Sequence, residues 1–298
     1  MLLGAHESTS GGLHEAYPRA LADGAEAVQI FTKSSRMWRA KEITAGDAAL
    51  FRTHSGKAGF RASVHASYLI NLGSGPGDLR EKSIAAFTDE LMRCDLIGAP
   101  YLVVHPGSCP ETDRGLSAIA DGLDRTFAAH KGPCVVLLET AAGQGSALGR
   151  TFEELRAIRD RCKSPDRVAV CLDTCHIFAA GYDISSDRGY DETFEKFEQV
   201  LGTGLIRAFH LNDSMKPLAC RVDRHEQVCK GEIGTLAFRR LVNDERFRDV
   251  PGYLEIPPEH NRACLERLHK LRAGSRPKAQ IAAGHKGRSR VATRRPAD

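Results

Sequence analysis

The chain has 298 residues, of which 42% are hydrophobic and 27% are charged, with a formal net charge of +4. This length and apolar content are sufficient for one large buried core and are typical of a single α/β domain. No run of about 18 apolar residues occurs, and the start of the chain lacks a basic segment followed by an apolar one. We therefore expect a soluble, cytoplasmic protein without a membrane partner.

The cysteines argue against a disulfide framework. There are nine, an odd number, with no CxxC pair, and several lie inside apolar runs. We expect reduced and mostly buried thiols, as in an intracellular protein.

The positive charge is concentrated at the end of the chain. Residues 271–298 contain eight Lys or Arg and one acid, so this segment carries +7 and the remainder −3. The segment is rich in small and basic residues and has no apolar periodicity, which is typical of disorder. We expect a catalytic domain over residues 1–272 and a basic, disordered tail over 273–298. Two interpretations of the tail stay open: a solvated extension, or an element that attracts nucleic acid.

Eight short apolar runs recur along the chain, and charged amphipathic stretches follow them. The runs are Leu2–Ala5, Ala27–Phe31, Phe60–Val64, Tyr101–Val104, Cys134–Leu138, Val168–Leu172, Leu205–Phe209 and Gly252–Leu254. Helical patterns between them include Gly11–Ala22, Asp78–Ile97 and Phe152–Arg161. Alternating strands and helices predict right-handed crossovers and a parallel sheet. Eight such units favour a closed (β/α)8 TIM barrel over an open sheet.

Titratable residues follow seven of the eight runs. They are His6, His65, His105, Glu139, Asp173, His210 and Glu255. A single polar residue at the end of a strand needs no functional explanation, but seven of eight ends exceed what the composition predicts. Because the carboxyl ends of barrel strands share one face, these residues should converge there in an active site.

Imidazoles and carboxylates without thiolates are the ligands that Zn²⁺ or Mn²⁺ would take. Further candidates are His176, three residues after Asp173, and the pair Asp223 and His225 in "RVDRHE". The full set of candidate ligands is His65, His105, Glu139, Asp173, His176, His210, Asp223, His225 and Glu255. Nine ligands are too many for one four-coordinate ion, so we expect two or three ions that share carboxylates. Adjacent ions of this kind suit phosphoryl transfer.

Long motifs surround these residues. They are "HASYLINLG" (65–73), "HPGS" (105–108), "ETAAGQGS" (139–146), "CLDTCHIFAAGYD" (171–183), "HLNDS" (210–214), "RVDRH" (221–225) and "KGEIG" (230–234). In this order they resemble the motifs of the endonuclease IV family of apurinic/apyrimidinic endonucleases, which have a xylose-isomerase-like TIM barrel. The resemblance covers about residues 1 to 270.

The resemblance implies a centre of three zinc ions, with manganese possible at one position. His65, His105 and Glu139 would surround one ion, and Glu139 would bridge to a second ion. Asp173, His210 and Glu255 would complete the second site, and His176, Asp223 and His225 would hold the third ion. Glu139 and Glu255 would be the catalytic carboxylates, with Glu255 also able to orient the attacking water.

The activity that the resemblance implies is hydrolysis of the phosphodiester bond 5′ to an abasic site, which leaves a 3′-hydroxyl and a 5′-deoxyribose phosphate. Removal of groups that block 3′ ends is expected as well. The partner would be double-stranded DNA with abasic sites or blocked 3′ ends, and we expect a monomer that is associated with the nucleoid when it acts.

Three residues outside the ligand set are expected to contact DNA. In the resembled family, residues that match Arg36, Tyr68 and Leu69 enter the duplex at the lesion. Apolar wedges must unstack bases, and the cost is lowest where a base is already missing, so such residues favour damaged DNA. For Trp38, packing within its loop is the preferred interpretation.

Two departures from the family pattern affect the surroundings of the ligands. Ala66 stands where members often carry Asp, which would remove an acceptor for His65. Cys229 stands where Gly is usual, in the loop after His225. Neither departure removes a ligand.

Two other functions remain as alternatives. A metal-dependent sugar isomerase or epimerase would use the same barrel, but such a site needs one or two ions and does not account for nine ligands. A non-catalytic DNA-binding scaffold would hold metals only for structure, and structural zinc sites normally close around four ligands.

Overall fold

Eight parallel strands close into a barrel in the computed structural model, which describes residues 1–272. The strands are β1 (Leu2–His6), β2 (Ala27–Ile30), β3 (Ala62–His65), β4 (Tyr101–Val104), β5 (Val135–Glu139), β6 (Val168–Asp173), β7 (Ile206–His210) and β10 (Pro251–Leu254). They pair in the order β1-β10-β7-β6-β5-β4-β3-β2, and β2 pairs with β1 to close the barrel. The predicted TIM barrel is confirmed, whereas the predicted tail, residues 273–298, lies outside the described residues.

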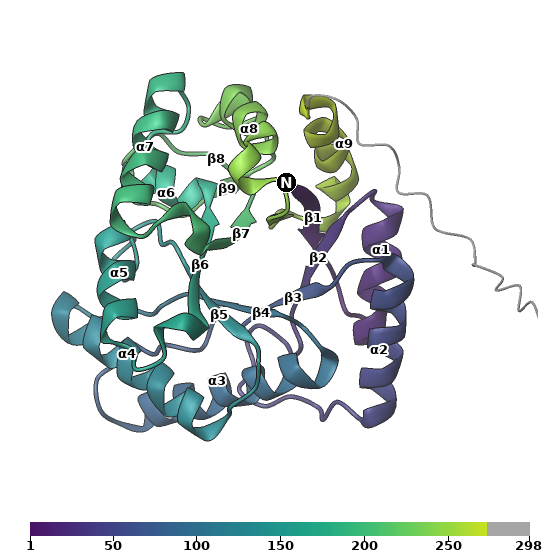
Figure 1. Cartoon of the computed structure of the whole chain (residues 1–298), viewed down its shortest axis with the longest axis vertical. Coiled ribbons are helices and arrows are strands. Elements are labelled where there is room, and N and C mark those ends of the chain that lie inside the picture. Colours follow the sequence, from purple (N-terminus) through teal and green to yellow (C-terminus); the bar gives the residue numbers. More distant parts are fainter. Residues whose placement is uncertain (273–298) are drawn as a thin grey trace, which may run out of the picture.

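Helices surround the barrel (Figure 1). They are α1 (Ala16–Ala22), α2 (Ala45–Ala58), α3 (Asp78–Ile97), α4 (Thr112–Ala129), α5 (Phe152–Arg161), α6 (Thr174–Ala180), α7 (Asp187–Val200), α8 (Gly234–Asn243) and α9 (Asn261–Leu271). Five short 3₁₀ helices cover Leu13–Glu15, Pro165–Arg167, Thr203–Leu205, Glu245–Phe247 and Pro258–His260. Among residues 1–272, no helix combines the length and apolar composition needed to cross a membrane.

Some predicted boundaries differ from those of the structure. The helix predicted from Gly11 begins only at Ala16, after a 3₁₀ turn. Gly11 and Gly12 have φ angles of +89° and +138°, which are incompatible with a right-handed helix. Five of the residues expected to follow a strand instead end it: His6, His65, Glu139, Asp173 and His210.

Strand periodicity explains why the polar residues meet inside the barrel mouth. Alternate residues of a strand point to the same face. Leu137 and Cys171 belong to a compact cluster of buried residues that also receives Val135. Two residues beyond them on the same faces of β5 and β6 come Glu139 and Asp173. The apolar filling of the barrel therefore ends in a layer of titratable side chains.

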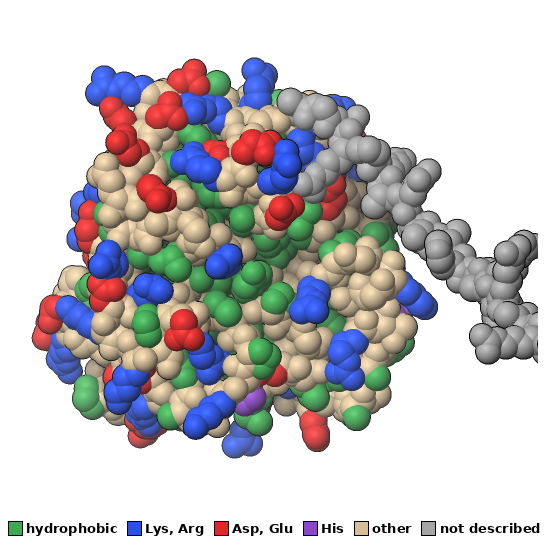
Figure 2. Space-filling model, viewed as in Figure 1, with side chains coloured by type: hydrophobic (Ala, Val, Ile, Leu, Met, Phe, Trp, Pro, Cys, Tyr) green, Lys and Arg blue, Asp and Glu red, His purple; other side chains and the backbone are tan. Residues whose placement is uncertain are grey.

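A larger apolar layer lies between barrel and helices. It includes Val136 and Leu138 of β5, whose side chains face away from the barrel interior, and Phe87 and Leu91 of α3. All nine cysteines are free and seven are buried, as expected. Over the face drawn in Figure 2, Lys and Arg side chains are interspersed with Asp and Glu, and hydrophobic side chains gather at the centre.

One element was not expected from the sequence. β8 (Asp213–Ser214) and β9 (His225–Glu226) pair as a two-stranded antiparallel ribbon between β7 and α8. The ribbon folds the segment back so that His225 returns to the barrel mouth.

Candidate metal centre

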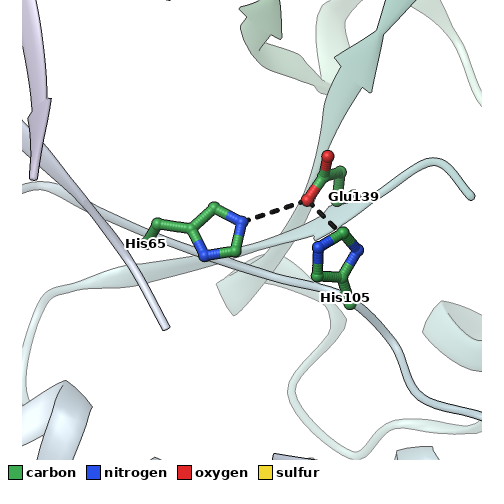
Figure 3. Close-up of side chains that lie close together, drawn as sticks. All are labelled: His65, His105 and Glu139. Atoms are coloured by element: carbon green, nitrogen blue, oxygen red, sulfur yellow. Dashed lines mark hydrogen bonds and ion pairs between the residues drawn. The ribbon is translucent and has the colours of Figure 1, made fainter. Parts of the chain in front are cut away.

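The first group of candidate ligands comes from three neighbouring strands. His65 ends β3, His105 follows β4, and Glu139 ends β5. Figure 3 shows both imidazoles turned toward one carboxylate oxygen of Glu139. The distances to Glu139 Oε2 are 3.2 Å from His65 Nε2 and 3.4 Å from His105 Nδ1.

The second group uses the other oxygen of the same carboxylate. His210 Nδ1 lies 2.9 Å from Glu139 Oε1 and 3.1 Å from Glu255 Oε2. Asp173 Oδ2 is 3.7 Å from the same ring nitrogen. Glu139, Asp173 and His210 are fully buried, so in the absence of a cation their charges have no solvent to stabilise them.

The third group depends on the turn that follows β6. Asp173 is the N-cap of α6, and its Oδ1 accepts a hydrogen bond of 2.9 Å from the backbone N–H of His176. This cap places His176 in the first turn of the helix, facing the ribbon. Asp223 lies between the two rings, with 3.2 Å from Oδ2 to His176 Nε2 and 3.2 Å from Oδ1 to His225 Nε2.

The loop that carries Asp223 and His225 adopts unusual backbone conformations. Ala219, Arg221 and Cys229 have φ angles of 62°, 56° and 65°, a region that favours glycine. Backbone hydrogen bonds from Ala219 N to Phe178 O (3.1 Å) and from Arg221 N to Ala179 O (2.9 Å) hold the loop against α6. The departure at Cys229 therefore occupies a position where glycine would be less strained.

Three of the imidazoles are oriented by a hydrogen bond from Nδ1 to a backbone oxygen. His65 Nδ1 donates to the backbone oxygen of Ala66 (2.8 Å), and His176 Nδ1 donates to that of Thr140 (2.8 Å). His225 Nδ1 donates to the backbone oxygen of Glu255 (3.1 Å). Because a carbonyl can only accept, these nitrogens carry hydrogen, and in the neutral rings Nε2 offers a lone pair to the cluster. His65 Nδ1 thus has a backbone acceptor, although the side chain of Ala66 offers none.

The facing nitrogens are what a cation site requires. His176 Nε2 and His225 Nε2 lie 3.4 Å apart, and two lone pairs at that separation repel unless a proton or a metal ion lies nearby. Tetrahedral zinc with bonds of about 2.0–2.1 Å places its ligand atoms roughly 3.3 Å apart. The ligand-atom distances of 3.2 to 3.4 Å in the first and third groups fit this spacing.

The electrostatics of these side chains support the same interpretation. Burial opposes ionisation of Glu139, but His105, His210 and His176 hold its pKa well below the usual range. Burial alone would lower the pKa of His225, yet Asp173 and Asp223 raise it to about 9. Asp173 and Asp223 therefore keep a proton on His225 in a position where a metal ion would replace it.

Two residues at the centre were missed by the sequence reasoning. Gln29 of β2 accepts a hydrogen bond from His210 Nε2 (3.1 Å) and donates to Glu255 Oε1 (2.7 Å). Asn212 donates to Asp173 Oδ2 (2.7 Å) and accepts from Glu255 N (2.9 Å). Gln29 could have been found from its place in the strand. It points to the same face of β2 as Ala27, which lies in the barrel interior. His6, at the end of β1, also lies beside these residues, with its Nδ1 3.1 Å from Gln29 Nε2.

The expected DNA-contacting residues lie at the rim of the same mouth. The Tyr68 ring is 5.4 Å from the His65 ring and 5.8 Å from the His105 ring, and the residue is 52% exposed. Arg36 is exposed and Leu69 is partly exposed. Trp38 packs partly buried against the core, as expected. A cavity of about 460 Å³ lies beside Tyr68 and Glu255.

Comparisons with known proteins identify the family. Residues 18–277 match a family described as xylose isomerase-like TIM barrel. The probable endonuclease 4 of Chloroflexus aurantiacus is 47% identical over 258 residues, which cover 85% of this chain and 90% of that protein. The chain belongs to the endonuclease IV family.

A solved endonuclease IV supports this assignment. The crystal structure of the enzyme from Thermus thermophilus has a TM-score of 0.82 and 35% identity, and the match covers 91% of this chain and 98% of that one. A D-tagatose 3-epimerase-like protein also matches, with a TM-score of 0.68 but only 19% identity. The second likeness shows that the endonuclease IV barrel is shared with that protein, and nothing more.

Proposed function

We propose that this protein is an apurinic/apyrimidinic endonuclease that cleaves DNA 5′ to an abasic site and leaves a 3′-hydroxyl and a 5′-deoxyribose phosphate. We propose further that it removes blocking groups from 3′ ends. The observation that carries the proposal is the clustering of the nine candidate ligands into groups of three or four, two of which share Glu139. Membership of the endonuclease IV family, whose named members include the relatives above, supports the choice of DNA as substrate.

The donor set fits three divalent cations, for which we favour zinc, with manganese compatible at one position because of the oxygen-rich ligands. His65, His105 and Glu139 would hold the first ion. Glu139, Asp173, His210 and Glu255 would hold the second, and His176, Asp223 and His225 the third. When bound, such ions neutralise phosphoryl oxygens and lower the pKa of water.

The side chains of the protein would supply orientation. We assign Glu255 the role of orienting the attacking water, because Gln29 Nε2 donates to its Oε1 and fixes the carboxylate. Glu139, shared by two groups, would set the spacing of the centre. Tyr68, whose ring lies beside the first group, and Leu69 would fill the space left by an extruded abasic nucleotide, and Arg36 would contact the duplex.

Incubation of the zinc-loaded protein with a duplex that bears one stable abasic analogue tests this proposal, with an undamaged duplex as control. We expect incision 5′ to the lesion only, with a product end that a polymerase extends. Epimerisation of a ketose without incision would favour the sugar-enzyme alternative. Binding of damaged DNA without cleavage by the loaded protein would favour the scaffold.

A further inference from the structure

The two loops that carry the proposed DNA contacts are bonded to each other. The segment 31–44 after β2 carries Arg36, and the segment 66–77 after β3 carries Tyr68 and Leu69. Ser67 Oγ donates to the backbone oxygen of Ser35 (2.8 Å), and Tyr68 N donates to the same oxygen (3.0 Å). The junction is therefore one residue away from both Arg36 and Leu69.

A single buried carboxylate on α3 is bonded to both loops. Glu90 is 0% exposed. Its Oε2 accepts from Thr32 Oγ1 (2.8 Å) in the first loop, and its Oε1 accepts from Ser67 N (3.2 Å) in the second. Glu90 thus bonds each loop two residues after its strand ends.

Two cations complete this buried network. Lys33 Nζ, also buried, lies 3.4 Å from Glu90 Oε1 and 3.2 Å from Asp89 Oδ2. Arg93 donates to Thr32 through Nε (3.1 Å, to Oγ1) and Nη2 (2.6 Å, to the backbone oxygen). Its Nη1 reaches the backbone oxygen of Lys41 (3.0 Å), near the far end of the first loop.

Stability alone does not explain such a network. Removing charges from water is costly, and buried ion pairs can often be replaced by apolar residues without loss of stability. What hydrogen-bonded charges add is a defined geometry, and here every bond ends on one of the two loops or on α3. Glu90 belongs to none of the groups of candidate metal ligands found among residues 1–272.

We propose that Glu90 is a positioning residue that locks the two loops into one rigid surface, so that Arg36, Tyr68 and Leu69 engage a damaged duplex together. The inference rests on the proposed function for its substrate. This bonded arrangement of Glu90 with Thr32 and Ser67, which we call the lock, is a property of the fold and can be tested without DNA.

The first test is hydrogen exchange in the zinc-loaded protein. Glu90→Gln keeps the shape of the side chain but removes its charge, and Thr32→Val removes the hydroxyl between Glu90 and Arg93. In either variant, amides 67–70 should exchange at least tenfold faster while those of β5 and β6 stay unchanged. Unchanged exchange at 67–70 in both variants would overturn the lock.

The second test is a double-mutant cycle on incision of an abasic duplex, with zinc content measured in every variant. Glu90→Gln should lose tenfold or more at full zinc occupancy. Because Glu90 acts through Tyr68, its effect should shrink when it is combined with Tyr68→Ala. If the fold losses of the two single variants multiply in the double variant, Glu90 does not act through Tyr68 and the inference is contradicted. Thr32→Val replaces Glu90→Gln in the cycle if the latter does not fold.

Leu91→Ala is the matched control, since Leu91 is fully buried on the same helix and its side chain has no polar atom to bond to either loop. It should lower the stability to unfolding without faster exchange at 67–70 under native conditions. Loss of incision equal to that of Glu90→Gln in this control would assign the effect to general destabilisation. A wild-type protein that cuts no abasic duplex would refute the proposed function, while the exchange result would still decide the lock.

Discussion

At the scale of single residues, protonation of the candidate ligand imidazoles should couple metal binding to pH. In the metal-free protein, Asp173 and Asp223 outweigh burial and raise the pKa of His225 from 6.5 to about 9. Below pH 9 an incoming ion must displace that proton, so zinc affinity should rise with pH up to about 9. Calorimetry in buffers of different ionisation enthalpy measures the protons released, and a pH-independent affinity with no release would contradict this coupling.

The same pKa shift predicts the opposite trend for the stability of the chelated protein. A histidine whose pKa is raised by folding stabilises the folded state below pH 6.5, and this contribution is lost as pH rises to 9. The urea midpoint of the chelated protein should therefore fall from pH 6.5 to 9. His225→Gln should flatten the decrease, and the same decrease in that variant would assign it to other groups.

Glu139 is the residue on which the count of ions depends most directly. Its two oxygens face different ligand groups, so Glu139→Gln should weaken two of the three proposed sites. We expect the variant to retain about one ion per chain by elemental analysis and to lose incision by several powers of ten. Glu232→Gln, an exposed substitution in the loop between β9 and α8, is the control and should retain the full complement of ions. Equal metal contents in both variants would exclude a bridging role.

At the scale of structural elements, the loop after β3 is predicted to recognise the lesion through Tyr68 and Leu69. If Tyr68 and Leu69 replace the missing base, changing both to Ala removes contacts worth roughly 1–3 kcal/mol each. Incision of an abasic duplex should fall by one to a few powers of ten. Removal of a 3′-phosphate from a frayed end, which requires less distortion of DNA, should fall less. Equal losses on both substrates at full metal occupancy would show that these residues do not sense the lesion.

The ends of the strands could be predicted from sequence because hydrophobic periodicity stops there. Leu137 precedes Glu139 and Cys171 precedes Asp173 on the same faces, so the direction of these ligands follows from the strand pattern. The loops follow no such period. The ribbon of β8 and β9 depends on backbone bonds and on positive φ angles at residues that are not glycine, and neither has a sequence signature.

The residues that hold the candidate ligands in place were harder to predict than the candidate ligands, because their role also depends on contacts that no sequence period indicates. Gln29 and Asn212 act through bonds to residues far away in the chain, for example from Gln29 to Glu255. Their amide side chains are ordinary surface residue types, and only burial in the barrel mouth makes them informative. The same holds for Glu90, which in sequence resembles any charged position of an amphipathic helix.

At the scale of the whole molecule, the barrel should fold without metal. Its apolar layers are built from residues such as Leu137 and Phe87, which do not depend on the ions. Ions that bind only the folded state add stability, about 2.7 kcal/mol per site at a free concentration one hundred times the Kd. Chelation should therefore lower the Tm while far-ultraviolet circular dichroism at 25 °C stays unchanged. Unfolding at 25 °C on chelation would show that the metal centre is needed for folding.

The basic tail is predicted from charge alone. Residues 271–298 carry +7, so deletion of 274–298 should weaken DNA binding and reduce its dependence on salt. Zinc content and Tm should stay the same. Equal affinities and equal salt slopes for the two forms would leave the solvated extension as the interpretation of this segment.

The most direct test of the three-ion centre is an anomalous-scattering measurement on crystals of the zinc-loaded protein. We expect three zinc peaks: one among His65, His105 and Glu139; one among Glu139, Asp173, His210 and Glu255; and one among His176, Asp223 and His225. Three ions per chain by elemental analysis should accompany them. A single peak in a fully loaded, active protein would contradict the three-ion centre.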